Sequence, residues 1–267
     1  MKEWKLDGNA VNGTNPSYTH TITQAVNVTV SFEPKKALLT LEAGKNTVKV
    51  KAKTADGSAI KVEGCNETTL ASEAETTLTA KVAGTQIALI GDITELNCRG
   101  EEMPGGNRPL ASLDASGLTA LQELYCNTNQ IPELNVHDLT KLQKLDCRSN
   151  KLTSLNVQGL TKLQQLNCSG NQLSTLNVQG CTSLKELLCY QNKLNADAFI
   201  RIFNDLPEHQ TSDGATAVLY ADRAGGTEDN CKDFNTPAEL KTAFENAKNI
   251  KHWKMKKRGE LGLEQDI

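Results

Sequence analysis

The sequence is poor in aromatic residues, which make up 4% of its 267 positions, and it contains no long apolar run. A helix that crosses a bilayer needs about 20 consecutive apolar residues, so no membrane-inserted segment is predicted. The four histidines are scattered and no cysteine pair has CxxC spacing, which argues against a zinc knuckle or a thioredoxin-type site. The net charge is −3, whereas a nucleic-acid-binding protein should carry a basic face, so no nucleic-acid partner is predicted.

Motifs for catalysis are missing as well. No Ser-His-Asp, HExxH, phosphate-loop or Cys-His arrangement can be recognised in the sequence. Glu101 and Glu102 are adjacent, and in an extended loop their carboxylates would point apart, which is a poor geometry for acid–base catalysis. We therefore predict a protein that is not an enzyme and that uses no cofactor and no metal ion.

What the sequence does contain is an internal repeat. Segments 139–159 and 160–180 are identical at 14 of 21 positions, and the shared pattern is LxxLxCxxNxLxxLxV. An irregular unit at 93–100 precedes the regular ones, with its extra residues in the loop 99–109. A unit of this length can bury its leucines only by stacking on its neighbours. About five stacked coils with one parallel sheet are therefore predicted over 93–195.

A cysteine recurs every 21 residues in these coils, and alternation along a strand directs it inward between leucines. A linear row of thiols does not suit tetrahedral zinc, parallel inward side chains fit disulfide geometry poorly, and a catalytic thiolate needs a polar, partly exposed setting. Buried free thiols are therefore favoured over metal ligands, nucleophiles and disulfides. A bridge that involves Cys65 or Cys231 stays open, and Cys181 also lies off the row. The asparagines three residues after the cysteines are predicted to bond backbone groups in the turns. The two structural ladders are Cys98, Cys126, Cys147, Cys168 and Cys189, and Asn129, Asn150, Asn171 and Asn192.

The repeats resemble the cysteine-ladder leucine-rich repeats of internalin J-like bacterial surface proteins, over about 93–195. Residues 1–34, with KEWKLDGNAV and VTVSF, resemble the second half of an internalin-type B-repeat, a small β domain. That family is generally exported, so the resemblance implies a secreted or cell-surface location. The start MKEWKLDGNAV lacks the apolar core of a signal peptide, and we expect that the chain was cut from a longer protein.

The predicted fold class is a leucine-rich-repeat solenoid with a parallel β-sheet, 21-residue repeats and little helix. Its expected segments are a partial β-repeat (1–35), a β-rich N-terminal cap (36–92), the leucine-rich repeats (93–195) and an α/β C-terminal cap (196–267). In the last segment Asn195 is expected to cap a helix, and Thr236-Pro237-Ala238-Glu239 is expected to form a capping box. Residues 256–267 are expected to be a polar tail, with the basic cluster at 254–258 in solvent.

The outward face of the repeat strands is the usual binding surface of such solenoids, and tyrosine and arginine are enriched at binding hot spots. Alternation predicts these candidates for ligand binding: Arg99, Tyr125, Asn127, Asp146, Arg148, Asn167 and Tyr190. The loop 99–109 is a second candidate surface. The predicted function is an adhesin-like module that binds a host protein or glycan as a monomer. The alternative is a structural spacer in a larger surface protein.

Overall fold

The structure is a computed structural model of the chain, and it describes residues 3–6, 9–11, 28–31, 35–103, 105–222, 228–259 and 261–267. Two compact units are present, Met1–Lys35 and Lys36–Ile267. In the first unit β1 (Glu3–Leu6) lies between β2 (Asn9–Val11) and β3 (Val28–Ser31) in an antiparallel sheet. Trp4 is paired with Val30 in this sheet. The assignment of this unit to the internalin-type B-repeat stays a prediction.

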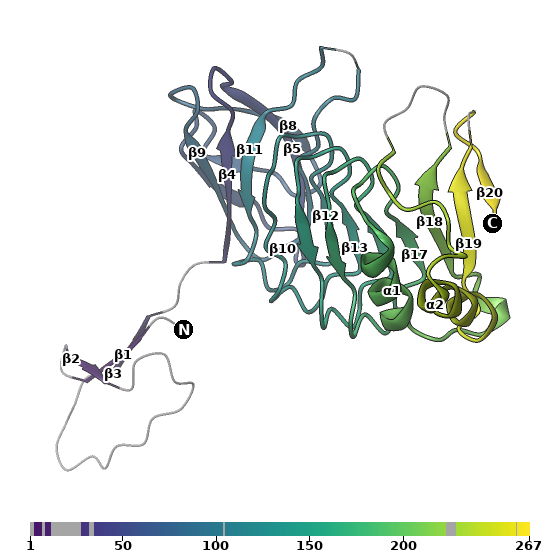
Figure 1. Ribbon diagram of the computed structural model, residues 1–267. Helices are drawn as coiled ribbons and strands as arrows, with labels where there is room; N and C mark the ends of the chain where they lie inside the picture. The colour runs from purple at the N-terminus through teal and green to yellow at the C-terminus, as the bar shows by residue number, and fades with distance from the viewer. Residues whose placement is uncertain are drawn as a thin grey trace, which may run out of the picture. The chain divides into compact units, whose positions relative to one another are not determined.

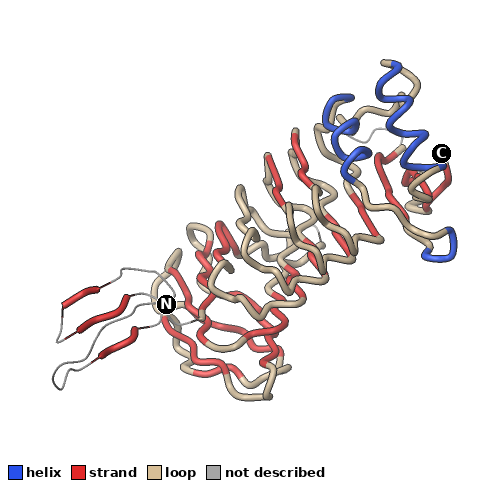
Figure 2. Tube along the Cα trace, turned by 90° about the horizontal axis from the view of Figure 1, so that it is seen from below, coloured by secondary structure: helices blue, strands red, loops and turns tan. Residues whose placement is uncertain are grey.

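A ten-stranded sheet runs through the second unit in the order β20-β19-β18-β17-β15-β13-β12-β10-β5-β8 (Figure 1). Its centre holds one parallel strand from each coil: β10 (Ile93–Asn97), β12 (Glu123–Tyr125), β13 (Lys144–Asp146), β15 (Gln165–Asn167) and β17 (Glu186–Leu188). Because the regular coils repeat every 21 residues, their strands pair without stagger, as Leu124 with Leu145 and Leu145 with Leu166. The solenoid predicted from the period is confirmed, and Figure 2 shows its coils one behind the other.

The core of the solenoid lies inside the coils, where all five ladder cysteines are fully buried. Three of these thiols donate to a strand carbonyl of the next coil, with Sγ–O distances of 3.5 to 3.7 Å: Cys147 to Asn167, Cys168 to Leu188 and Cys189 to Val218. Burial raises the pKa of Cys98 and of Cys168 to about 12. The ladder cysteines are free thiols that act as small apolar core residues with a weak donor.

The recurring asparagines close every turn in the same way. Asn150 Nδ2 donates to the carbonyls of Cys126 at 3.1 Å and Cys147 at 3.0 Å, and its Oδ1 accepts from the Ile131 N–H at 3.1 Å. Equivalent bonds are made by the other three ladder asparagines, Asn129, Asn171 and Asn192. Each side chain therefore satisfies backbone groups of its own coil and of the preceding coil, which a turn would otherwise leave unpaired.

Asn230 extends the asparagine ladder by one residue that the repeat period did not predict. Its Oδ1 accepts from the Leu194 N–H at 2.8 Å, and its Nδ2 donates to the carbonyls of Cys189 at 2.9 Å and Leu219 at 2.8 Å. It lies 38 residues after Asn192, outside the 21-residue spacing. The C-terminal segment thus continues the turn geometry of the repeats without their sequence.

At the N-terminal end, two sheets meet the first coil. β5 (Thr47–Thr54) pairs antiparallel with β10 and with β8 (Glu75–Thr79), and so extends the main sheet. A five-stranded antiparallel sheet has the order β11-β4-β9-β6-β7 and contains β4 (Lys36–Leu41), β6 (Ile60–Glu63), β7 (Thr69–Leu70), β9 (Gln86–Ile90) and β11 (Leu110–Asp114). Since β11 comes from the first coil, residues 36–92 and this coil share both sheets, and the division at 92/93 stays a prediction.

At the C-terminal end the parallel sheet continues through β18 (Thr216–Ala221) and β19 (Lys254–Arg258), and β20 (Glu264–Asp266) pairs antiparallel with β19. The expected polar tail at 256–267 is therefore wrong. Only Met255 of β19 is fully buried, and backbone pairing with β18 holds the strand in the sheet although its other side chains are basic. The basic cluster at 254–258 is part of a folded surface.

Two helices complete the cap, α1 (Ala196–Asp205) and α2 (Ala238–Asn249), with a 3₁₀ turn at Thr211–Asp213. Asn195 caps α1 as expected, since its Oδ1 accepts from the Ala198 N–H at 2.9 Å. The expected capping box of α2 is wrong, because Pro237 occupies the cap position and its side chain has no acceptor. Across the coils from the main sheet, β14 (Ser154–Asn156) and β16 (Thr175–Asn177) form a short parallel pair.

Candidate binding surface

The outward side chains of β12, β13, β15 and β17 form two rows, which we call the strand face: Glu123, Lys144, Gln165 and Glu186 in one, and Tyr125, Asp146, Asn167 and Leu188 in the other. Each row is in register from strand to strand, because the strands pair without stagger. The second row borders a shallow hollow of about 130 Å³. Most of these side chains are half-buried by their neighbours on adjacent strands.

Hydrogen bonds and an ion pair connect neighbours on the strand face. The Tyr125 hydroxyl donates to Glu123 Oε2 at 2.5 Å, and Lys144 Nζ lies 3.1 Å from Glu123 Oε1. Gln165 Nε2 donates to Glu186 Oε2 at 2.9 Å. Burial and the Glu123 carboxylate raise the pKa of Tyr125, so its hydroxyl stays protonated and donates at neutral pH. The side chains of the strand face are therefore held in position by their neighbours.

Arg148 joins the strand face to the enlarged loop. Its Nη1 lies 2.6 Å from Asp146 Oδ2, and its Nη2 lies 2.5 Å from Glu102 Oε1. Burial raises the pKa of Asp146, whose side chain is only 16% exposed, while Arg148 lowers the pKa of Glu102. The loop 99–109 thus contacts the strand face through this ion pair, so the two surfaces predicted separately from the sequence adjoin each other.

The path of the loop 99–109 is determined at its start, by Gly100. The Gly100 N–H donates to the Asn127 carbonyl at 2.9 Å, and a Cβ at this position would lie 1.8 Å from the Thr128 oxygen. Only glycine therefore permits this approach. Farther along, Glu101 Oε2 accepts from the Asn107 N–H at 3.0 Å and Oε1 lies 3.7 Å from Lys49 Nζ. Glu101 and Glu102 have different partners, so they do not form an acid–base pair.

The structure places the seven predicted binding residues differently. Arg99 is exposed, and Tyr125, Asp146, Arg148 and Asn167 are partly exposed on one continuous surface. The expectation that Asn127 and Tyr190 also face solvent is wrong, since they are 2% and 9% exposed.

Each of these two burials has its own cause. Asn127 lies beneath the start of the loop and its Nδ2 donates to Thr128 Oγ1 at 3.2 Å. Tyr190 packs against Val218 and Ala221 of β18, and its hydroxyl accepts from Arg258 Nη1 at 3.1 Å. Tyr190 is covered by β18, a strand beyond the last repeat that the 21-residue period does not predict.

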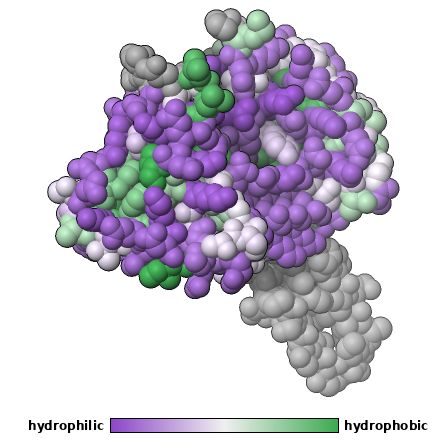
Figure 3. Space-filling view, turned by 90° about the vertical axis from the view of Figure 1, so that its right-hand side faces the viewer, coloured by the Kyte–Doolittle hydropathy of each residue, from purple (hydrophilic) through white to green (hydrophobic). Residues whose placement is uncertain are grey.

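Sequence reasoning missed the extension of the strand face beyond the repeats. Glu186 is in register with Thr216 and then Lys254, and Leu188 with Val218 and then Lys256. The lysines make this end of the face basic, although Lys256 Nζ lies 3.0 Å from Glu264 Oε2. Figure 3 shows the C-terminal end as mostly hydrophilic, with a few separate apolar areas. In the sequence, this extension was indicated by the strand-like stretch KHWKM (251–255), which overlaps the first two residues of β19.

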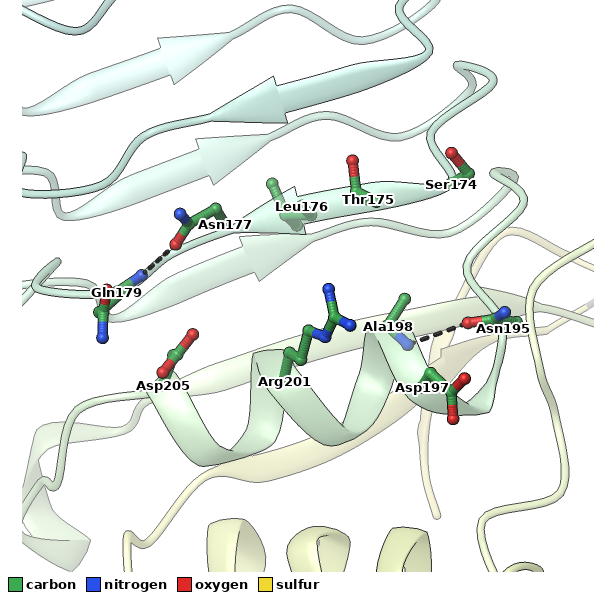
Figure 4. Close-up of a pocket in the computed structure, with 10 residues that line it drawn as sticks. All are labelled: Ser174, Thr175, Leu176, Asn177, Gln179, Asn195, Asp197, Ala198, Arg201 and Asp205. Atoms are coloured by element: carbon green, nitrogen blue, oxygen red, sulfur yellow. Dashed lines mark hydrogen bonds between the residues drawn. The ribbon is translucent and has the colours of Figure 1, made fainter.

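A larger hollow, of about 480 Å³, lies between β16 and α1 (Figure 4). Arg201 points from α1 toward β16, and Asp197 and Asp205 stand on the same helix one turn to either side. The polar wall opposite is fixed by a bond from the Gln179 N–H to Asn177 Oδ1 at 3.0 Å. Opposite charges alternate along the helix, so this hollow presents no uniform charge to a ligand.

Within the described ranges, no group of three or more His, Cys, Asp and Glu side chains could hold a metal ion. No helix within the same part of the chain is long and apolar enough to cross a membrane.

Comparison with known proteins addresses the central coils. The family described as Leucine Rich repeats (2 copies) matches residues 140–180. These residues are leucine-rich repeats. The sequence-based recognition of this repeat is thereby confirmed, and leucine-rich-repeat stacks are in general non-enzymatic scaffolds for protein interaction.

One similar solved structure is described as the functional domain of InlJ from Listeria monocytogenes, which includes a cysteine ladder. Its sequence is 27% identical, with a TM-score of 0.36, and the match covers 48% of this chain and 25% of that chain. This chain therefore matches about a quarter of that chain's length. No curated protein matches. The leucine-rich-repeat fold of this chain rests on its own strand register and on the family match.

Proposed function

We propose that this chain is a non-enzymatic, adhesin-like module whose strand face binds a protein partner. The observation that carries the proposal is the contact of Glu102, from the enlarged loop, with Arg148 on the strand face. It fixes an arginine between two carboxylates beside the hollow bordered by Tyr125 and Asn167. Arginine and tyrosine held in this way are the residue types that dominate binding energy at protein interfaces.

The same observation favours binding over a purely structural role. A spacer needs only soluble side chains on its outward strands. The strand face instead holds a carboxylate, Asp146, that is largely removed from water and paired, which offers little net stability at a solvent-facing position. Fixed polar groups on rigid strands reduce the entropy lost when a partner binds. A secreted or cell-surface location with a host protein as partner is supported by the internalin-like character of the repeats.

The test compares the chain with a Tyr125→Ala/Arg148→Ala variant on a panel of host extracellular proteins and on a glycan array. Loss of two central contacts should weaken binding of a protein partner by at least tenfold. A Lys141→Ala/Lys162→Ala variant is the matched control, because both lysines are exposed at equivalent repeat positions away from the strand face. Thermal unfolding followed by circular dichroism checks that the variants are folded.

Removal of Arg148 leaves Asp146 without its partner, so a second variant keeps that pair intact. Lys144→Glu reverses a half-buried charge at the centre of the strand face and should also weaken binding. If the chain binds no member of the panel, the spacer alternative is preferred. If both variants bind as tightly as the unmodified chain, the strand face is not the binding surface. Binding to glycans alone would contradict the protein partner.

A further inference from the structure

A second polar surface lies along the turns that follow the repeat strands, where a groove of about 710 Å³ runs across the coils. In Figure 1 these turns form the upper rim of the solenoid, between the raised loop near residue 100 and the C-terminal strands. We call it the turn groove. The residues that define it are Arg108, Gln130, Lys151, Gln172 and Lys193.

The members of this row stand on successive coils. The N–H of Lys151 donates to Ile131 O at 2.9 Å, and that of Lys193 donates to Leu173 O at 2.9 Å. The N–H of Gln130 and Gln172 are bound to the preceding coil in the same way. Neighbouring strands of a sheet lie about 4.8 Å apart, so Lys151 and Lys193, two coils apart, are separated by about 10 Å. The ammonium groups of Lys151 and Lys193 therefore alternate with the amides of Gln130 and Gln172, and Arg108, one residue before the equivalent position of the first coil, adds a third cation.

None of these five side chains has a hydrogen-bond or ion-pair partner within the described ranges. The groove lining contains three cations and one carboxylate, Asp229, whereas the whole chain has a net charge of −3. The ladder asparagines that line its floor already use their amides on backbone carbonyls. The groove therefore offers a ligand a periodic set of side-chain donors: ammonium, guanidinium and primary amide.

We infer that the turn groove binds an acidic polysaccharide in which every second sugar carries a carboxylate. A pyranose ring in an extended chain advances the polymer by about the spacing of two neighbouring coils. Carboxylates on alternate sugars would then meet the cations, where charge-assisted hydrogen bonds are strongest. The neutral sugars between them would place hydroxyl groups against Gln130 and Gln172, whose amides both donate and accept.

Other polyanions fit this lining less well. An extended acidic peptide gains affinity from main-chain pairing and apolar pockets, but the backbone N–H groups of Gln130, Lys151, Gln172 and Lys193 are already bound to the preceding coil. The lining contains no apolar side chain that could form such a pocket. A single-stranded nucleic acid gains affinity by stacking bases on aromatic side chains, and the lining has none. The proposal is independent of the strand face, which lies on a different side of the coils.

The test measures binding of the full chain to defined probes by isothermal titration calorimetry. A hyaluronan decasaccharide has a carboxylate on every second sugar, dextran has none, and poly-glutamate is an acidic peptide. The chain should bind the decasaccharide, should not bind dextran, and should bind poly-glutamate more weakly than the decasaccharide. Binding should weaken as salt concentration rises, because the contacts are largely electrostatic.

Paired variants locate the site. Lys151→Ala/Lys193→Ala should weaken binding of the decasaccharide by about tenfold or more, since two charge-assisted contacts are lost. Lys141→Ala/Lys162→Ala makes the same change in charge at two exposed lysines that precede the strands, and it should leave binding unchanged. No binding of the decasaccharide, equal losses in the two variants, or tighter binding of poly-glutamate would each overturn the inference.

Discussion

Removing the Asn150 side chain tests whether the asparagine ladder stabilises the solenoid. Asn150 is 9% exposed, and its amide makes three well-formed bonds with backbone groups of Cys126, Cys147 and Ile131. Asn150→Ala leaves the buried Ile131 N–H without its acceptor. The Cys126 and Cys147 carbonyls each lose one of two asparagine donors, since Asn129 Nδ2 and Asn171 Nδ2 still bond them.

The expected cost can be worked from these bonds. The two lost bonds to carbonyls contribute about 1 kcal/mol each and the unpaired Ile131 N–H costs about 1–3 kcal/mol, so the variant should lose about 3–5 kcal/mol of stability. For a chain of this size 1 kcal/mol corresponds to about 2–4 °C in Tm, which gives a decrease of roughly 6–20 °C. Since single domains are stable by only about 5–15 kcal/mol, this loss is a large part of the total.

Urea unfolding followed by circular dichroism measures the loss, with Asn156→Ala as control. Asn156 is exposed and its Oδ1 accepts one bond, from the Gln158 N–H at 3.0 Å, so its removal should cost at most about 1 kcal/mol. Asn150→Asp keeps the shape but places a second acceptor against the two carbonyls. Equal costs for Asn150→Ala and Asn156→Ala would refute the reasoning.

The pH dependence of Asn150→Asp gives a further check on that reasoning. The new carboxyl should have a raised pKa in the folded state, since its charged form faces carbonyl oxygens. Its stability relative to the unmodified chain should therefore improve as the pH falls and the carboxyl becomes a donor. A variant as stable as the unmodified chain at neutral pH would show that the Nδ2 bonds contribute nothing.

Two further predictions concern the thiols and the cap. Burial raises the folded pKa of Cys168 to about 12, above the value of about 8.5 for an unfolded thiol, so the unfolded chain loses its thiol protons first. The free energy of unfolding should therefore fall as the pH rises from about 8.5 toward 12, and a thiol reagent should reach the ladder cysteines only after unfolding; rapid native labelling would contradict their burial. Lys251→Met should destabilise the cap by about 1–3 kcal/mol in urea unfolding, and an unchanged midpoint would contradict this role. The reason is that Lys251 Nζ donates to three carbonyls at the end of α1, those of Phe203, Asn204 and Leu206.

The coils could be predicted because their repeat length appears directly in the sequence. A constant interval between Cys147 and Cys168 fixes the length of the coil, and strand register follows from it. Asn230 was not predicted because it lies 38 residues after Asn192 instead of 21, although its side chain makes the same kind of bonds as the ladder asparagines. Only the start of β19 fell within the strand-like stretch 251–255, and the rest was predicted as a polar tail, because the pairing of β19 with β18 cannot be read from composition.

The strand face was predicted only in part, for a related reason. Alternation determines which side chains point out of the coil, but it does not determine what later covers them. Asn127 is covered by a loop whose path depends on Gly100, and Tyr190 by a strand beyond the repeats. The ion pair between Glu102 and Arg148 joins residues 46 positions apart, so no local pattern could have indicated it.

The equal length and unstaggered pairing of the coils have a consequence for how such a chain can change in size. Every internal coil donates and accepts the same bonds as its neighbours. If a copy of residues 139–159 were inserted after Gly159, each existing coil would therefore still pack against a coil that makes the same bonds. The two ends would stay chemically unchanged while their separation grew by about 4.8 Å for each added unit. The turn groove would gain one more position in the same step, so the reach of the chain and the number of its binding positions increase together by duplication of one short segment.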